Sequence, residues 1–157
     1  MTEVLTPPSE TAVVLESKPN VSRRDYLFAI AGGFCLTLAY PPFSTGFLAY
    51  FALVPLLYAL KEKTPKQHLI LAYLFGLTFN ATALFWTWRV TLPGTAAMIL
   101  ILAFYWAVPF WIFGHSKKLW RWQAYLLLPF LLVGLEYFRT LGELAFPWTN
   151  LSYTQSY

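Results

Sequence analysis

The chain has 157 residues, of which 58% are hydrophobic, 20% aromatic and 11% charged. Because soluble domains carry about 25% charged residues, this composition excludes an ordinary soluble protein and indicates an integral membrane protein. The formal net charge of +4 comes from Lys and Arg in short clusters at the ends of apolar runs. That pattern is a topology signal and excludes a nucleic-acid partner.

The N-terminal residues 1–22 contain three prolines and no sustained helical periodicity, so they are predicted to form a mobile arm. Two apolar runs of 15 residues follow, at 26–40 and 46–60. A helix of that size is roughly 22 Å long, whereas the hydrocarbon core of a bilayer is ~30 Å thick. We therefore expect the first two helices either to lengthen into their flanks or to form a shallow hairpin.

The residues before the first run offer a second interpretation of the N-terminal part. Arg23 and Arg24 resemble the twin arginines of an export signal, which would make the chain up to about residue 40 a cleavable leader. A cationic flank on a first membrane helix is the simpler interpretation, because four more apolar runs follow.

Three longer apolar runs, at about 68–88, 95–114 and 122–138, are 17 to 21 residues long and are expected to span the bilayer. The sequence thus predicts an all-α integral membrane protein. Its domain is a bundle of about five transmembrane helices in residues 23–143, the first two of them short. A polar, aromatic segment, 144–157, follows the bundle, and the chain stops there.

The distribution of Lys and Arg predicts the orientation of this bundle. If the five runs alternate sides, nine of the 11 cations fall on one side and two on the other. The nine are Lys18, Arg23, Arg24, Lys61, Lys63, Lys66, Lys117, Lys118 and Arg121. Because cytoplasmic loops carry the excess of Lys and Arg, the N-terminus is predicted to be cytoplasmic and segment 144–157 external. The orientation is the same if the first two runs do not cross.

Few polar residues lie inside the predicted spans, and each requires a partner in lipid. Asn80 stands among Gly, Ala and Thr in the third run, which favours a packing role over a substrate contact. Glu136 and Arg139 are three residues apart near the outer end of the fifth run. On a helix they share a face, so we expect them to neutralise each other as a structural pair rather than to act in catalysis.

His68 and His115 stand at the cytoplasmic ends of the third and fourth runs. An imidazole there could ligate a metal or a tetrapyrrole pigment, although an interfacial polar role is the simpler interpretation. Cys35 lies inside the first run without a neighbouring base, so it is expected to be a buried, unreactive thiol. The sequence therefore predicts no catalytic residue, no metal site and no cofactor, with bound membrane lipid as the expected partner.

A series of short motifs occurs in order from about residue 26 to the end. They are Ala-Tyr-Pro-Pro-Phe (39–43), Ala-Leu-Val-Pro-Leu-Leu (52–57), Phe-Gly (75–76), Phe-Trp (85–86), Leu-Glu-Tyr-Phe-Arg (135–139), Phe-Pro-Trp (146–148) and Asn-Leu-Ser-Tyr-Thr-Gln (150–155). This order resembles the N-terminal membrane region of apolipoprotein N-acyltransferases. Its most specific part is Glu-x-x-Arg followed by Phe-Pro-Trp. Thr140 and Ala145 depart from the glycines expected there.

The resemblance implies a location and a role. It implies a bacterial inner-membrane protein whose nitrilase-like periplasmic domain uses a Glu-Lys-Cys set to pass an acyl chain from phospholipid to the N-terminal cysteine of a lipoprotein. Those three residues belong to a domain that would follow Tyr157, and they map onto no position of this sequence. By the same resemblance, Phe146, Trp148 and Tyr153 lie at the outer, periplasmic interface beside acyl chains, braced by the charged pair that ends the fifth run.

Three functions are weighed against these observations. The first is the membrane anchor of an apolipoprotein N-acyltransferase-like protein, inactive without its catalytic domain. The second is an accessory or assembly subunit of a larger membrane complex, derived from that family and binding pigments or lipids beside other membrane protein subunits. A small transporter or channel subunit is disfavoured, because the spans lack the ionisable residues and internal repeat expected of one. A long reading frame beyond Tyr157 would favour the first function, and a stop codon the second.

Overall fold

The computed structural model describes residues 20–43, 45–141 and 146–155, and in these ranges every regular element is a helix. The α-helices are α1 (Arg23–Leu38), α2 (Ala49–Ala59), α3 (Pro65–Ala83), α4 (Leu92–Trp120) and α5 (Ala124–Phe138). The 3-10 helices are η1 (Gly46–Leu48), η2 (Phe85–Arg89), η3 (Arg121–Gln123), η4 (Pro147–Thr149) and η5 (Leu151–Gln155). The prediction of an all-α fold is confirmed for these ranges. Most of the predicted arm, up to residue 19, lies outside the described residues.

Two capping boxes determine where α1 and α3 begin. The Ser22 amide donates to Asp25 Oδ2 at 2.8 Å, and the Thr64 amide donates to Gln67 Oε1 at 2.8 Å. In each box the cap side chain also accepts from a backbone N–H of the first turn, which has no partner inside the helix. Lys63 joins the two helix starts, because its Nζ lies 2.7 Å from Asp25 Oδ2. The start of α1 therefore lies beside the loop between α2 and α3.

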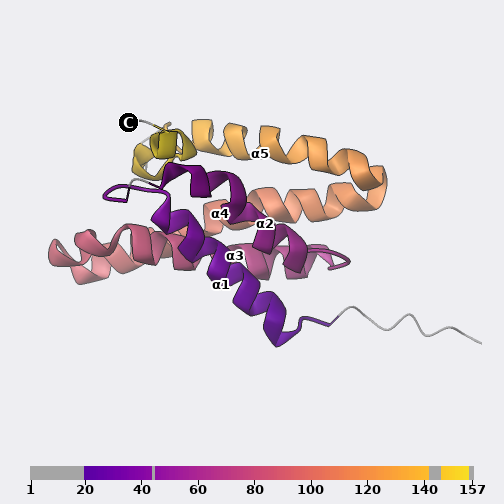
Figure 1. Cartoon of the computed structure of the whole chain (residues 1–157), viewed down its shortest axis with the longest axis horizontal. Coiled ribbons are helices and arrows are strands. Elements are labelled where there is room, and N and C mark those ends of the chain that lie inside the picture. Colours follow the sequence, from indigo (N-terminus) through magenta and orange to yellow (C-terminus); the bar gives the residue numbers. More distant parts are fainter. Residues whose placement is uncertain (1–19, 44, 142–145, 156–157) are drawn as a thin grey trace, which may run out of the picture.

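The helix α3 packs against both α1 and α4, and glycines allow the close approach. A Cβ atom added to Gly33 of α1 would lie 2.6 Å from the Phe75 carbonyl oxygen, and one added to Gly76 of α3 would lie 2.7 Å from Trp106 Cβ. Small residues at such contacts are how helices associate in lipid. Figure 1 shows α1 running obliquely across the bundle, with α4 and α5 as an antiparallel pair.

Only α4, among the helices of the described ranges, is long and apolar enough by itself to cross a membrane. Its segment Leu92–Lys118 has 27 residues and contains an 18-residue stretch with a mean hydropathy of 2.1, whereas Gly46–Ala59 and Ala124–Phe138 are apolar but shorter. The five predicted helices are present, but their lengths do not establish five crossings. Large apolar side chains are exposed on the short helices, as at Tyr50 of α2 and Phe130 of α5.

The predicted run 68–88 does not form one continuous α-helix. The helix α3 ends at Ala83, and the chain continues as η2. The Thr82 hydroxyl donates to the Thr78 carbonyl at 2.7 Å near this end. Side-chain bonds of this kind compete with the helical hydrogen-bond ladder and accompany a change to the tighter 3-10 helix.

The helix α4, in contrast, extends past Gly114, where the fourth apolar run was expected to end, and reaches Trp120. A Cβ atom on Gly114 would lie 2.9 Å from Cγ of His68. Gly114 therefore makes room for the His68 ring of α3 and does not terminate its own helix.

Replacing Gly33 with Ala is expected to destabilise the bundle by about 1–3 kcal/mol, because the new methyl group would overlap the backbone of α3. The matched control is Gly134→Ala in α5, where an added Cβ meets nothing within 4 Å and Ala is the better helix former by about 1 kcal/mol. Unfolding in mixed detergent micelles, followed by circular dichroism, measures both effects. Equal stability of the two variants would contradict the close α1–α3 packing.

Candidate functional site

The C-terminal segment (146–155) is formed by η4, η5 and the residues beside them, and it folds back onto the bundle. A short 3-10 segment cannot pair most of its own backbone groups, so these groups need partners elsewhere in the protein. The partners come from the end of α5, the end of α1 and the start of α2. The predicted segment 144–157 otherwise lies outside the described residues.

The end of α5 binds the C-terminal segment through two charged side chains. The buried Arg139 guanidinium donates through Nη2 to the Phe146 carbonyl at 3.0 Å and to the Thr149 hydroxyl. The Phe146 amide donates back to the Arg139 carbonyl at 3.1 Å. Glu136 Oε1 accepts a hydrogen bond of 2.6 Å from the Leu151 amide. Hydrogen bonds to charged groups are the stronger kind, so these contacts fix the segment firmly on α5.

The predicted direct pairing of Glu136 with Arg139 is wrong. The two side chains come from one end of α5, as their spacing requires, but within the described part of the chain each bonds to the C-terminal segment and they form no ion pair with each other. The reason is that backbone groups of the segment compete for the charges. A buried carbonyl or amide without a partner costs about 1–3 kcal/mol, and the two side chains supply those partners.

The opposite side of the C-terminal segment is bound to α1 and η1. The Tyr40 hydroxyl, just after α1, donates to the Thr149 carbonyl at 2.9 Å in a buried contact. Gln155 Nε2 donates to the Gly46 carbonyl at 3.1 Å, and its Oε1 accepts from the Tyr50 hydroxyl at 3.3 Å. Thr149 thus receives hydrogen bonds from both α5 and the end of α1.

Between the end of α1 and the C-terminal segment lies a cavity of about 300 Å³, lined by Tyr40, Pro41, Trp148 and Tyr153. Trp148 also stacks on the Trp86 ring of η2, with ring centroids 5.5 Å apart and planes inclined by 27°. The walls of the cavity are aromatic rings and a proline, and the two tyrosine residues carry hydroxyl groups. Such a lining suits an apolar chain better than a charged metabolite.

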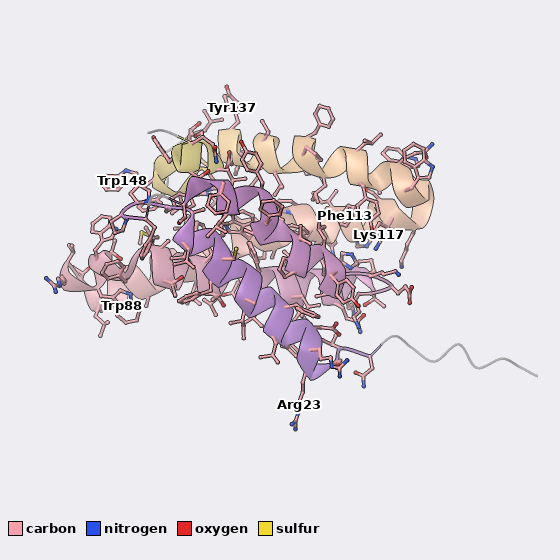
Figure 2. All side chains as sticks on the ribbon, viewed as in Figure 1. Arg23, Trp88, Phe113, Lys117, Tyr137 and Trp148 are labelled. Atoms are coloured by element: carbon pink, nitrogen blue, oxygen red, sulfur yellow. The ribbon has the colours of Figure 1, made fainter. Side chains whose placement is uncertain are left out.

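The ring of Phe146 also stacks with Trp148, with ring centroids 6.1 Å apart and an interplanar angle of 22°. The sequence-predicted interface residues Phe146, Trp148 and Tyr153 are therefore brought into one aromatic cluster at the C-terminal segment. Figure 2 shows Trp148 and Trp88 at one end of the molecule, with Lys117 and Phe113 toward the other.

The remaining polar residues singled out in the sequence lie apart from this cluster. Asn80 is fully buried in α3, and its Nδ2 donates to the Gly76 carbonyl at 2.7 Å. His68 is also fully buried; its Nδ1 lies 2.9 Å from the Thr64 carbonyl and its ring meets Phe113 edge to face. Both side chains thus pack within the bundle.

His115 lies on the exposed side of α4, with Nδ1 3.0 Å from the Trp111 carbonyl. In the part of the chain that the structure describes, no three His, Cys, Asp or Glu side chains come together in a way that could hold a metal ion. Cys35 is partly buried and packs against the hydrophobic core.

Residue-level sequence reasoning missed the roles of Tyr40, Thr149 and Gln155. Tyr40 and Gln155 were noted only as members of the family motifs, and no role was predicted for Thr149. The available signal was the position of Tyr40 before Pro41-Pro42. A proline pair ends a helix there, so the tyrosine lies beyond the last turn and is available to a segment packed on the helix end.

Comparisons with known proteins agree with the motif order. The family described as the apolipoprotein N-acyltransferase N-terminal domain matches residues 32–157. A protein of Geobacter metallireducens named apolipoprotein N-acyltransferase is 33% identical over 147 residues, covering 86% of this chain. Proteins of the same name from Azotobacter vinelandii and Gloeobacter violaceus are 33% and 32% identical, covering 82% and 80% of this chain.

This chain covers only 27–28% of the length of those three relatives. The matched region includes the C-terminal part of α1, all the later helices and the C-terminal segment that carries the aromatic cluster. The resemblance inferred from the motifs is thereby confirmed, and the chain belongs to the apolipoprotein N-acyltransferase family, matching its N-terminal domain.

Proposed function

We propose that this chain is the membrane-anchoring domain of an apolipoprotein N-acyltransferase and that it presents the C-terminal segment to lipid at the periplasmic surface of a bacterial inner membrane. The observation that carries the proposal is the C-terminal segment itself. It is bound at three places to the bundle, and it lines an aromatic cavity at the end of the molecule opposite Lys117.

The orientation is supported by the cations at the other end of the bundle. Lys117 Nζ lies 3.4 Å from the Leu60 carbonyl at the end of α2, and Lys63 of the same loop binds Asp25 at the start of α1. Three elements that carry Lys and Arg therefore meet at one end. By the positive-inside tendency that end faces the cytoplasm, so the end with Trp148 faces outward.

Lipid is the proposed ligand of the aromatic cavity. Tyr and Trp rings favour the boundary between headgroups and acyl chains, because each has an apolar body and a polar tip. Trp148 and Tyr153 are 60% and 45% exposed, so an apolar chain could reach both. We assign the acyl transfer itself to residues outside this chain, since the relatives with that name are much longer.

Reporter fusions test the orientation. Alkaline phosphatase fused after Tyr157 is expected to be active, and a green fluorescent protein at the same point to be dark, because both report a periplasmic location. The matched control is a pair of fusions after Glu62, in the loop between α2 and α3, which should give the opposite pattern. Fluorescence after Tyr157 without phosphatase activity would overturn the orientation.

Photoreactive phospholipid tests the cavity. A phospholipid carrying a diazirine in its acyl chain should label the peptide that contains Tyr153, and Trp148→Ala should reduce this labelling several-fold by removing one cavity wall. Phe130→Ala is the control, because this exposed ring lies on α5 outside the cavity. Labelling that is equally strong in Trp148→Ala would contradict a lipid-binding cavity.

Tyr40→Phe tests whether the C-terminal segment depends on α1. Loss of the hydroxyl leaves the Thr149 carbonyl without this donor, at a cost of about 1–2 kcal/mol, or roughly 5- to 30-fold in the opening equilibrium. Amide exchange at Leu151 and Tyr153 should quicken by that factor. Tyr58→Phe, an exposed tyrosine on α2, should leave it unchanged. Equal exchange in both variants would show that α5 alone fixes the segment.

A further inference from the structure

A second, much smaller cavity lies where α4, α5 and the C-terminal segment meet. It has a volume of about 10 Å³ and is lined by Trp106, Leu132, Leu135, Glu136, Arg139 and Leu151. One water molecule needs about 10–15 Å³ of such space, so the cavity has the size of a single water.

Two residues that line the cavity each have a buried nitrogen atom without a hydrogen-bond partner among the described residues. These atoms are Nε1 of Trp106 and Nε of Arg139, and each residue is 3% exposed. Both atoms carry a hydrogen to donate. A buried donor without an acceptor costs about 1–3 kcal/mol, and more for a charged group, so the pair predicts an acceptor inside the cavity.

The third polar group of the cavity wall limits what that acceptor can be. The Glu136 carboxylate accepts from the Leu151 amide through Oε1 and retains further acceptor capacity. An anion in the cavity would be repelled by this carboxylate, and a cation would be repelled by Arg139. A neutral group that both accepts and donates satisfies all three side chains.

We propose that one buried water molecule occupies this cavity and bridges Trp106, Arg139 and Glu136. The water accepts from Trp106 Nε1–H and Arg139 Nε–H and donates to the Glu136 carboxylate, which gives it three partners, the usual number for a buried water. The bridge links α4 to the charged end of α5 that binds the C-terminal segment. It also couples Glu136 to Arg139, which do not bond to each other directly.

Nuclear magnetic resonance of the chain with ¹⁵N-labelled tryptophan, in deuterated detergent, tests the proposal. Trp106→Phe identifies the indole signal of Trp106, or contacts with Phe75 and Phe79 identify it if that variant does not fold. The indole proton of Trp106 should give cross-peaks at the water frequency whose NOE and ROE have opposite signs, the signature of a long-lived water. Cross-peaks to protein protons alone would overturn the bridge.

Filling the cavity provides the matched pair of variants. Leu135→Phe should abolish the water cross-peak while leaving the other indole signals in place, because Leu135 lines the cavity. Val133→Phe introduces the same ring at an exposed position of α5 and should retain the cross-peak. A water cross-peak that persists in folded Leu135→Phe, or one that is lost in folded Val133→Phe, would place the water elsewhere and overturn the proposal.

Discussion

The position of the C-terminal segment depends on one buried charge, the guanidinium of Arg139. Removing such a charge from water is costly unless it is fully hydrogen bonded, and a 3-10 segment has carbonyl groups that lack partners. The guanidinium and the segment supply hydrogen-bond partners to each other, because Arg139 donates to the Phe146 carbonyl and to the Thr149 hydroxyl. These hydrogen bonds, with the one that Glu136 accepts from the Leu151 amide, join the end of α5 and the segment into one unit.

The aromatic cavity then depends on how closely α1 approaches α3. The helix α1 packs on α3 at Gly33, where no side chain separates the backbones, and Tyr40 just beyond the end of α1 donates to Thr149. The cavity has one wall after α1, at Tyr40, and another in the C-terminal segment, at Trp148. One wall of the cavity therefore follows a helix that is packed closely against the middle of the bundle.

The sequence predicted the helices, their order and the family, because hydrophobic runs and motif order depend on residues close together in the chain. The pairing of Glu136 with Arg139 was wrong for a physical reason. Their spacing shows that they share a helix face, but the competing acceptors and donors come from residues 7 to 15 positions further along. The donor role of Tyr40 was equally hidden, because its acceptor at Thr149 is 109 positions away.

The helices of the bundle differ in length, and this difference bears on the role of the C-terminal segment beside the aromatic cavity. The 27-residue segment Leu92–Lys118 of α4 extends about 40 Å, whereas the 11 residues of α2 extend about 17 Å. In the proposed membrane location, the start of α2 would otherwise leave backbone groups in hydrocarbon, at a depth that α4 would cross. The C-terminal segment covers this difference, because Gln155 donates to Gly46 beside α2 while Trp148 stacks on Trp86 beside the start of α4. Under the proposed function, the aromatic cavity would therefore lie where the short helices fall short of the membrane thickness.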